Sequence, residues 1–232
     1  TLLLSPDSEF IFQSEVLAKK DVLKFYRTYS YNMDPKKITT DIEKITKYRE
    51  RKKDLERRVK ILEKSDLPQH KQELKTLEKM HTLGKVNFDS VVILDFGERL
   101  KSVLTSFMFV DVPSNEVNFF SINQWFDKTF FAENAMENLH FPSINLKNLE
   151  KFRKKYFKAY EEEANDVSIL AYDALGLIYY CWNNNGKEFK INQLYNKNGF
   201  KGLHAEFIID KNMSKQKLKI YKVSNKKFLE IN

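Results

Sequence analysis

The sequence has few of the residues that most catalytic and metal-binding motifs require. It contains 6 glycines, 5 prolines, 4 histidines and 1 cysteine among 232 residues. No glycine-rich dinucleotide fingerprint, phosphate-binding loop, G-x-S-x-G elbow or H-E-x-x-H motif occurs. The histidines are scattered, so we expect each of them at the surface or at a helix cap and not in a metal site. The sequence therefore predicts a protein without enzymatic activity, catalytic residues, cofactor or metal.

Long hydrophobic runs are absent as well. A membrane-spanning helix would need about 18 consecutive apolar residues, and no such run occurs. The chain opens in the apolar residues 1–4 without an initiator methionine or a basic leader region, so we expect a fragment whose targeting signal lies upstream. The net charge of +8 raises the question of nucleic-acid binding. Because the abundance of Lys, Asn and Ile is typical of an AT-rich genome, we attribute the lysine excess to coding bias and expect no nucleic-acid partner.

What the chain does contain is an alternation of apolar segments with two different periods. Short apolar runs predict strands and 3.6-residue spacing predicts helices. The expected order is strand 2–5, helix 10–20, strand 22–31, strand 91–94, helix 97–108, strand 116–121, helices 146–162 and 166–182, and short antiparallel strands within 203–231. Strands that alternate with helices predict an α/β fold with a parallel sheet flanked by helices.

A strongly charged helical pair interrupts this alternation at residues 35–80. Asp34 followed by Pro35 marks a helix start, and one long helix is expected to run to about Lys64 before a second helix over 69–80. Acidic and basic residues are interleaved there, which favours i,i+4 pairing on a solvated face. A coiled-coil arm for a partner and a phosphate-binding surface are the alternatives. The candidate partner-binding residues are Arg49, Arg57 and Arg58.

The stretch VNFDSVVILDFGERL places Asp95 directly between an apolar strand and a helix start. We favour Asp95 as the N-cap of that helix, in a variant capping box with Glu98. Alternatively, Asp95 lines the cleft beyond the carboxyl ends of parallel strands, where open α/β sheets bind ligands. Both interpretations can hold at once. The candidate ligand-binding residues at the predicted strand ends are Ser5, Asp7, Ser8, Asp95, Asn123 and Trp125.

Several stretches resemble known families. Residues 171–177, AYDALGL, resemble a helix late in type I periplasmic-binding folds, the class of branched-chain amino-acid receptors, and GFKG at 199–202 resembles their ending. The segments KMHTLG, FDS and DFGERL within 79–100 resemble the middle of the penicillin-binding-protein activator lipoproteins of alphaproteobacteria. The chain departs from the pattern of the family at Phe10-Ile11, where an aromatic residue followed by a glycine is common, and around His204-Ala205, where a second glycine of the pattern is replaced.

The resemblance implies a two-lobed, flytrap-like fold whose N-terminal lobe is incomplete here. Residues 1–130 would form the second-lobe α/β domain, including the helical pair 35–80. Residues 131–232 would complete the lobes with the helices of 146–182 and the terminal strands of 203–231. The remaining strands of the first lobe, and a lipidated cysteine that anchors such proteins, are expected upstream of Thr1.

Three functions remain open on these grounds. We favour a periplasmic activator that binds a bifunctional peptidoglycan synthase, a penicillin-binding protein, in cell-wall synthesis. The alternative is the substrate-binding receptor of a branched-chain amino-acid or amide ABC transporter, with an amino acid and an ABC permease as partners. The third is a basic helical interaction module. The expected location is the periplasm, with membrane contact only through the upstream lipid anchor, which would tether the protein to the outer membrane.

Overall fold

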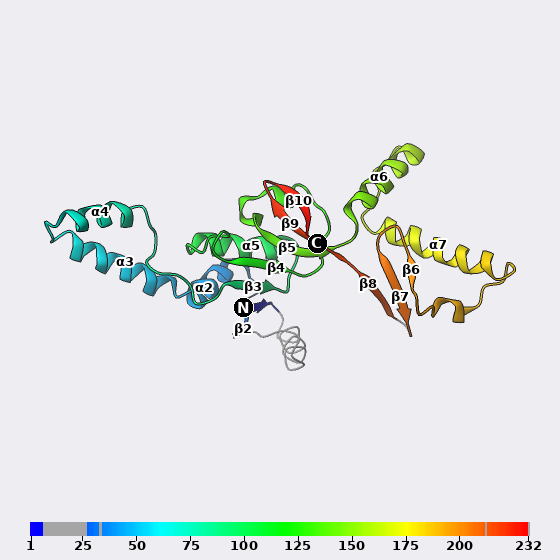
Figure 1. The fold of residues 1–232 in the computed structure, drawn as a ribbon, viewed down its shortest axis with the longest axis horizontal. Coiled ribbons are helices and arrows are strands. Elements are labelled where there is room, and N and C mark those ends of the chain that lie inside the picture. Colours follow the sequence, from blue (N-terminus) through cyan, green and yellow to red (C-terminus); the bar gives the residue numbers. More distant parts are fainter. Residues whose placement is uncertain (7–26, 33, 212, 232) are drawn as a thin grey trace. The chain divides into compact units, whose positions relative to one another are not determined.

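The computed structural model describes residues 1–6, 27–32, 34–211 and 213–231 (Figure 1). The predicted helix at 10–20 and the start of the strand at 22–31 lie outside these residues, as do Asp7 and Ser8. Among the described residues, none of the helices combines the length and the apolar composition that crossing a bilayer requires.

The fold is organised around a seven-stranded sheet with the order β10-β9-β5-β4-β3-β1-β2. Its strands are β1 Leu2–Ser5, β2 Arg27–Ser30, β3 Ser90–Ile93, β4 Asn118–Ser121, β5 Leu139–Ser143, β9 Lys219–Ser224 and β10 Lys227–Ile231. The run β2-β1-β3-β4-β5 is parallel throughout. Leu2, Leu3 and Leu4 are all at most 1% exposed, as expected for a parallel strand covered on both faces. The prediction of an α/β fold with a mostly parallel sheet and flanking helices is confirmed.

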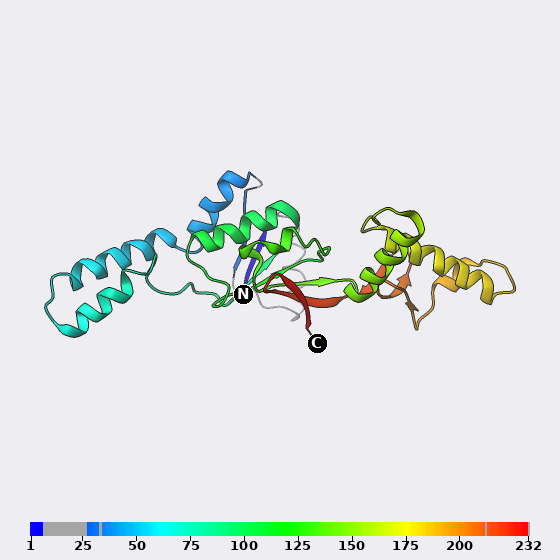
Figure 2. The same ribbon diagram turned by 90° about the horizontal axis from the view of Figure 1, so that it is seen from above.

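Two helices, α2 Pro35–Ile45 and α5 Gly97–Phe109, pack side by side near the sheet (Figure 2). Ile38 and Ile42 of α2 are fully buried, as is Phe107 of α5. The Phe107 ring lies 5.2 Å, centroid to centroid, from that of Phe119 in β4. These contacts join the helical layer to the sheet and form the core of this part of the protein.

The charged segment folds as the hairpin of α3 Tyr48–Leu62 and α4 Pro68–Leu77. It has a small core of its own, formed by Leu55, Leu62 and Leu77 with Val59, Leu74 and Leu83 packed against them. The prediction of one helix from 35 to about 64 is wrong, because the chain breaks after Ile45. The Thr46 hydroxyl donates back to the Ile42 carbonyl at 2.8 Å, and Lys47 takes a left-handed φ of 53°. This turn ends α2 and lets α3 begin in a new direction.

Arg51 fastens the base of the hairpin. Its side chain is 9% exposed and donates hydrogen bonds to the carbonyls of Gly84, Val110 and Asp111 and to the Thr82 hydroxyl. Burial lowers the pKa of the Arg51 guanidinium, and the charge of Asp111 opposes that shift. A buried cation is tolerated when its donors are satisfied, as they are here.

The chain divides into two compact units that interleave along the sequence. The first comprises Thr1–Ile122, Lys128–His140 and Lys222–Phe228, and the second Asn123–Asp127, Phe141–Tyr221 and Leu229–Asn232. Short 3-10 helices lie at Phe130–Ala132, Asn134–Met136 and Ile191–Leu194. The assignment of residues 1–130 to a second lobe and of 131–232 to a completing segment stays a prediction.

The second unit contains two helices and a separate three-stranded sheet. The helices are α6 Leu146–Tyr160 and α7 Ser168–Asn184, close to their predicted positions. The antiparallel sheet consists of β6 Phe200–Lys201, β7 Glu206–Asp210 and β8 Met213–Lys217.

In the seven-stranded sheet, strands β9 and β10 are joined by Asn225 and Lys226, both at positive φ. This is the two-residue hairpin turn expected between adjacent antiparallel strands. Strand β5 was not predicted.

Candidate functional site at the carboxyl edge of the parallel sheet

Four strand ends meet at one edge of the parallel sheet. Ser5 ends β1, Tyr31 follows β2, Asp95 follows β3 and Ser121 ends β4. The backbone N–H of Tyr31 donates to the Ser5 carbonyl at 3.1 Å, and the Ser121 hydroxyl donates to the Asp95 carbonyl at 3.0 Å. Parallel pairing places all carboxyl ends on the same side, so this edge is where an open α/β sheet binds ligands.

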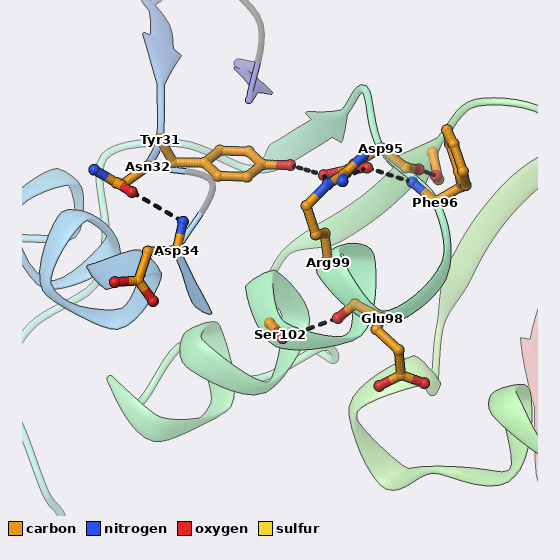
Figure 3. Close-up of polar contacts among 9 residues, drawn as sticks. Tyr31, Asn32, Asp34, Asp95, Phe96, Glu98, Arg99 and Ser102 are labelled. Atoms are coloured by element: carbon orange, nitrogen blue, oxygen red, sulfur yellow. Dashed lines mark hydrogen bonds and ion pairs between the residues drawn. The ribbon is translucent and has the colours of Figure 1, made fainter. Parts of the chain in front are cut away.

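The Asp95 carboxylate is the centre of a buried polar network at this edge (Figure 3). Its side chain is 1% exposed. One oxygen, Oδ2, accepts hydrogen bonds from the Tyr31 hydroxyl at 2.6 Å and from Arg99 Nε at 3.0 Å. The other, Oδ1, accepts from the Phe96 backbone N–H at 2.8 Å. The network joins β3 and α5 to β2, which is distant in the sequence: Tyr31 and Asp95 are 64 residues apart.

The structure corrects the capping-box interpretation of Asp95. Helix α5 begins at Gly97, and its N-cap is Phe96, which has no side-chain capping bond. Gly97 takes a left-handed φ of 61°, so the chain turns between strand and helix, and the Asp95 side chain stays at the sheet edge. Figure 3 shows the Glu98 side chain directed away from Asp95. Of the two interpretations, only the position at the carboxyl ends of the strands is kept.

The charges of the network are matched. Burial raises the pKa of the Tyr31 hydroxyl well above its ordinary value, and the hydrogen bond to Asp95 raises it further, so Tyr31 is a neutral donor. The hydrogen bond and charge of Asp95 raise the pKa of the Arg99 guanidinium. A buried carboxylate is costly unless it is paired and hydrogen-bonded, and Asp95 meets both conditions.

Arg99 and Phe96 present a cation and an aromatic ring to solvent beside this network. The Arg99 side chain is 36% exposed, and among the described residues only its Nε forms a hydrogen bond, which leaves the two terminal nitrogens available. The Phe96 side chain is 59% exposed, and its ring centroid lies 5.8 Å from Arg99 Cζ. The oxygens of Asp95 accept hydrogen bonds from Tyr31, Phe96 and Arg99, so Asp95 positions the Arg99 side chain.

The other predicted ligand residues are placed differently. Ser5 is fully buried at the same edge as Asp95. Asn123 is exposed and Trp125 partly buried, and both belong to the second unit. Asp7 and Ser8 lie outside the described residues. Ligand binding by these six residues stays a prediction.

Three residues of this site escaped the sequence analysis. Tyr31 is the last residue of the strand predicted at 22–31, and Arg99 stands four positions after Asp95. That spacing was a usable signal for the Asp95–Arg99 ion pair. The exposed position of Phe96 had no such signal.

The three arginines proposed for partner binding each contact a carboxylate. The N–O distances are 3.2 Å for Arg49–Glu43, 3.3 Å for Arg57–Asp54 and 2.8 Å for Arg58–Glu73. Arg58 bonds both oxygens of Glu73, and this fork connects α3 to α4. Arg58 therefore has a structural role, and partner binding by these arginines stays a prediction.

The second unit holds a buried acid–base pair that the sequence analysis did not identify. Asp173 of α7 accepts hydrogen bonds from the backbone N–H and the ring Nδ1 of His204. His204 is 4% exposed, so the expectation that it lies at the surface or at a cap is wrong. A Cβ on Gly202 would overlap the Asp173 carboxylate, which explains the glycine. Among the described residues, no group of three or more His, Cys, Asp or Glu could hold a metal ion.

Comparison with solved structures identifies the fold. A protein from Rhodospirillum rubrum assigned to a branched-chain amino acid ABC transporter has a TM-score of 0.54 at 13% identity, with 62% of this chain and 44% of that chain covered. An extracellular ligand binding receptor from Desulfohalobium retbaense DSM5692 has a TM-score of 0.49 at 12% identity, with 99% and 35% covered. This chain thus spans less than half of either protein. No protein-family model and no curated protein matches the sequence. The fold is that of the type I periplasmic-binding proteins.

Proposed function

We propose that this chain belongs to an extracytoplasmic binding protein without enzymatic activity, whose ligand binds at the carboxyl edge of the parallel sheet. The observation that carries the proposal is the position of Arg99, whose Nε is bonded to buried Asp95 while its side chain is 36% exposed. A guanidinium binds a carboxylate through two parallel hydrogen bonds. Because Asp95 already fixes the side chain, little conformational freedom is lost when a ligand binds.

The surroundings of Arg99 favour an amino acid with an apolar side chain. Its carboxylate would bind the terminal nitrogens of Arg99, and its apolar part would contact the exposed ring of Phe96. The R. rubrum protein with the same fold is assigned to a branched-chain amino acid ABC transporter, which supports this ligand class. The partner would then be an ABC permease. This receptor function takes precedence over the synthase activator that the sequence resemblance favoured.

A thermal-shift titration with a panel of amino acids and amides tests the proposal. A ligand present at about a hundred times its dissociation constant adds about 2.7 kcal/mol of stability and raises the melting temperature. We expect Phe96→Ala and Arg99→Lys to reduce the shift, because the first removes the ring and the second removes the planar fork. The matched control is Arg57→Lys, an exposed arginine on α3. An undiminished shift in both variants would place the ligand elsewhere.

The α3–α4 hairpin supports a second candidate function, the binding of a peptidoglycan synthase. It has its own core, and its outer surface exposes Ile61 and Leu67, at 55% and 57%. On this hypothesis Arg57→Glu weakens the binding of this chain to the purified synthase, measured by interferometry. The control is Lys36→Glu on α2, outside the hairpin, which should leave the binding unchanged. Arg58 is left unchanged because its pair with Glu73 holds the hairpin together. If the Arg57→Glu variant bound the synthase as tightly as the wild-type protein, Arg57 would not be part of the contact.

A further inference from the structure

The pair formed by Asp173 and His204 uses only one of the two ring nitrogens of the histidine. Asp173 in α7 accepts hydrogen bonds from the backbone N–H of His204, at 2.8 Å, and from its ring Nδ1. The other ring nitrogen, Nε2, is buried and has no hydrogen-bond partner among the described residues. His204 as a whole is 4% exposed. Buried polar atoms are nearly always hydrogen-bonded, so an unpartnered Nε2 requires an explanation.

The carboxylate fixes which nitrogen of the ring carries a proton. Burial alone would raise the pKa of the Asp173 carboxyl, but hydrogen bonds from the His204 ring and from backbone N–H groups hold it below its ordinary value. An ionised carboxylate only accepts hydrogen bonds, so Nδ1 must carry a proton. In the neutral ring Nε2 is then an acceptor, and in the imidazolium it is a donor. The pair with Asp173 therefore leaves Nε2 as the atom of this ring that a ligand can bind.

A cavity of about 200 Å³ lies beside His204 within the second unit. His204 lines it and Asp173 does not, so we place the cavity on the side of the histidine away from its carboxylate partner. The start of α6 contributes Asn145 and Asn148 to its wall, and strands β6 to β9 contribute the charged side chains. The volume exceeds the space of one water molecule several times. The cavity can thus hold a small polar ligand next to the histidine.

The charged side chains of the cavity favour an anion. Three lysines and one glutamate line it: Lys201, Lys217, Lys219 and Glu206. Lys217 lies 3.6 Å from Glu206, and Lys219 pairs with Glu230 of β10. Lys201 has no acidic partner among the described residues. The charge of Lys201, at an exposed position in β6, is therefore left unbalanced beside the cavity.

The first turn of α6 adds a partial positive charge. This helix has 15 residues, and its N-cap, Asn145, lines the cavity. The N-terminus of a helix attracts anions through its peptide dipoles and its N–H groups. The Asn148 N–H already donates to Asn145 Oδ1. The Leu146 N–H donates to the Tyr221 hydroxyl. The helix end thus contributes its dipole, and hydrogen bonds to a ligand must come largely from side chains.

A metal ion is the main alternative to an anion. Histidines that bind metals often donate their second ring nitrogen to a carboxylate, as His204 does to Asp173. Among the residues that the structure describes, however, no group of three or more His, Cys, Asp or Glu could hold a metal ion. The unbalanced charge of Lys201 would also repel a cation. An anion is compatible with both observations.

We propose that this cavity binds a small oxyanion, a phosphate or carboxylate group, which accepts a hydrogen bond from His204 Nε2 and pairs with Lys201. Because Nδ1 already donates to Asp173, the neutral ring must take up a second proton before Nε2 can donate. Binding of the anion is therefore coupled to protonation of His204, and the imidazolium lies between two anionic groups. The site belongs to the second unit and is independent of ligand binding at Arg99.

Nitrogen-15 NMR spectroscopy of the histidine side chains tests this coupling. The sequence has 4 histidines, and the signals of His204 are identified by their loss in His204→Gln or, if that variant does not fold, by substituting the other three in turn. Sulfate represents a phosphate group and acetate a carboxylate, and chloride keeps the ionic strength constant. We expect the Nε2 signal to move saturably to its protonated position. The affinity should be about tenfold higher at pH 6 than at pH 8, because one proton is taken up with the anion.

Lysine substitutions test the other half of the site. Lys201→Gln should weaken anion binding about two- to fivefold, the range expected for one exposed charge. The matched control is Lys197→Gln, an exposed lysine of the same unit that does not line the cavity, and it should leave the affinity unchanged. A response to sulfate alone would identify a phosphate-type ligand, and a response to acetate as well would include carboxylates.

Three results would overturn the proposal. If neither anion moved the His204 signals, the cavity would not be an anion site that uses this ring. If the affinity were the same at both pH values, no proton on His204 would be involved. If Lys201→Gln and Lys197→Gln weakened binding equally, the anion would be held by the general surface charge and not by this cavity.

Discussion

The two compact units of this protein use their apolar residues differently. Of the 24 large hydrophobic side chains that are exposed among the described residues, 7 lie in the first unit and 17 in the second, which is the smaller of the two. The first unit buries β1 completely and covers its parallel sheet with α2 and α5. The second unit has an apolar helix with one buried stripe. The first unit thus has a covered core, whereas the second leaves many apolar side chains exposed. This difference can be tested by substitution.

The largest effect is expected from Phe107→Ala in the first unit. Phe107 is fully buried and its ring contacts those of Phe88 and Phe119. Removing a buried phenylalanine ring lowers the free energy of unfolding by about 3–5 kcal/mol, through lost burial and the cavity left behind. Both tryptophans, Trp125 and Trp182, belong to the second unit, so their fluorescence would not report on the first. Unfolding in urea is therefore followed by far-UV circular dichroism.

The matched control for this substitution is Phe109→Ala, two positions along the same helix. Phe109 is 62% exposed, so its truncation should change the free energy of unfolding by about 0.5 kcal/mol or less. Similar losses from Phe107→Ala and Phe109→Ala would contradict the description of the first unit as a closed core.

A smaller effect is expected from Arg51→Met at the base of the hairpin. The substitution removes the donors to the carbonyls of Val110 and Asp111 and to the Thr82 hydroxyl, while its apolar stem still fills the space. Hydrogen bonds to charged groups contribute about 1.5–3 kcal/mol, so a loss of that order in the free energy of unfolding is expected. Arg57→Met on the same helix is the control, since Arg57 is an exposed arginine with a surface ion pair. Equal stability of the two variants would mean that Arg51 does not fasten the hairpin.

Local patterns in the sequence were sufficient for much of the fold. The apolar runs at residues 2–5 and 91–94 became β1 and β3. Strand β5 was missed because its sequence, LHFPS, is short and contains a proline, a residue that is uncommon within sheets. The break after Ile45 was missed although Arg49 and Lys52 interrupt the apolar spacing there, because that spacing resumes at Leu55. What ends α2 there is the Thr46 hydroxyl and the backbone of Lys47, which hydrophobic periodicity does not record.

The candidate site was predicted only in its position. Asp95 was placed at a strand end, which is where it lies, but its partner Tyr31 is 64 residues away in the sequence. A contact of that separation depends on the order of strands in the sheet, which no local pattern contains. The same holds for His204 and Asp173, 31 residues apart. Their pairing turned an expected surface histidine into a buried one.

The smallest effect of the series is expected in the second unit, from Asp173→Asn. Burial alone would raise the pKa of Asp173, but hydrogen bonds from the His204 side chain and from backbone N–H groups outweigh it, so the pKa lies below its ordinary value. A carboxyl group with a lowered pKa in the folded state stabilises the protein above its unfolded pKa of about 4, and this contribution is lost as the pH falls through the folded pKa. At neutral pH, where Asp173 is ionised, Asp173→Asn should cost about 1–2 kcal/mol.

Tryptophan fluorescence during urea unfolding reports on this change, because both tryptophans lie in the second unit. The difference between the wild-type protein and Asp173→Asn should be greatest at neutral pH and should shrink below about pH 4, where the Asp173 carboxyl of the unfolded chain begins to be protonated. Glu163→Gln, at an exposed position of the same unit, should follow the wild-type protein at every pH. A difference that stays constant down to the most acidic pH would mean that the pair with His204 does not depend on the charge of Asp173.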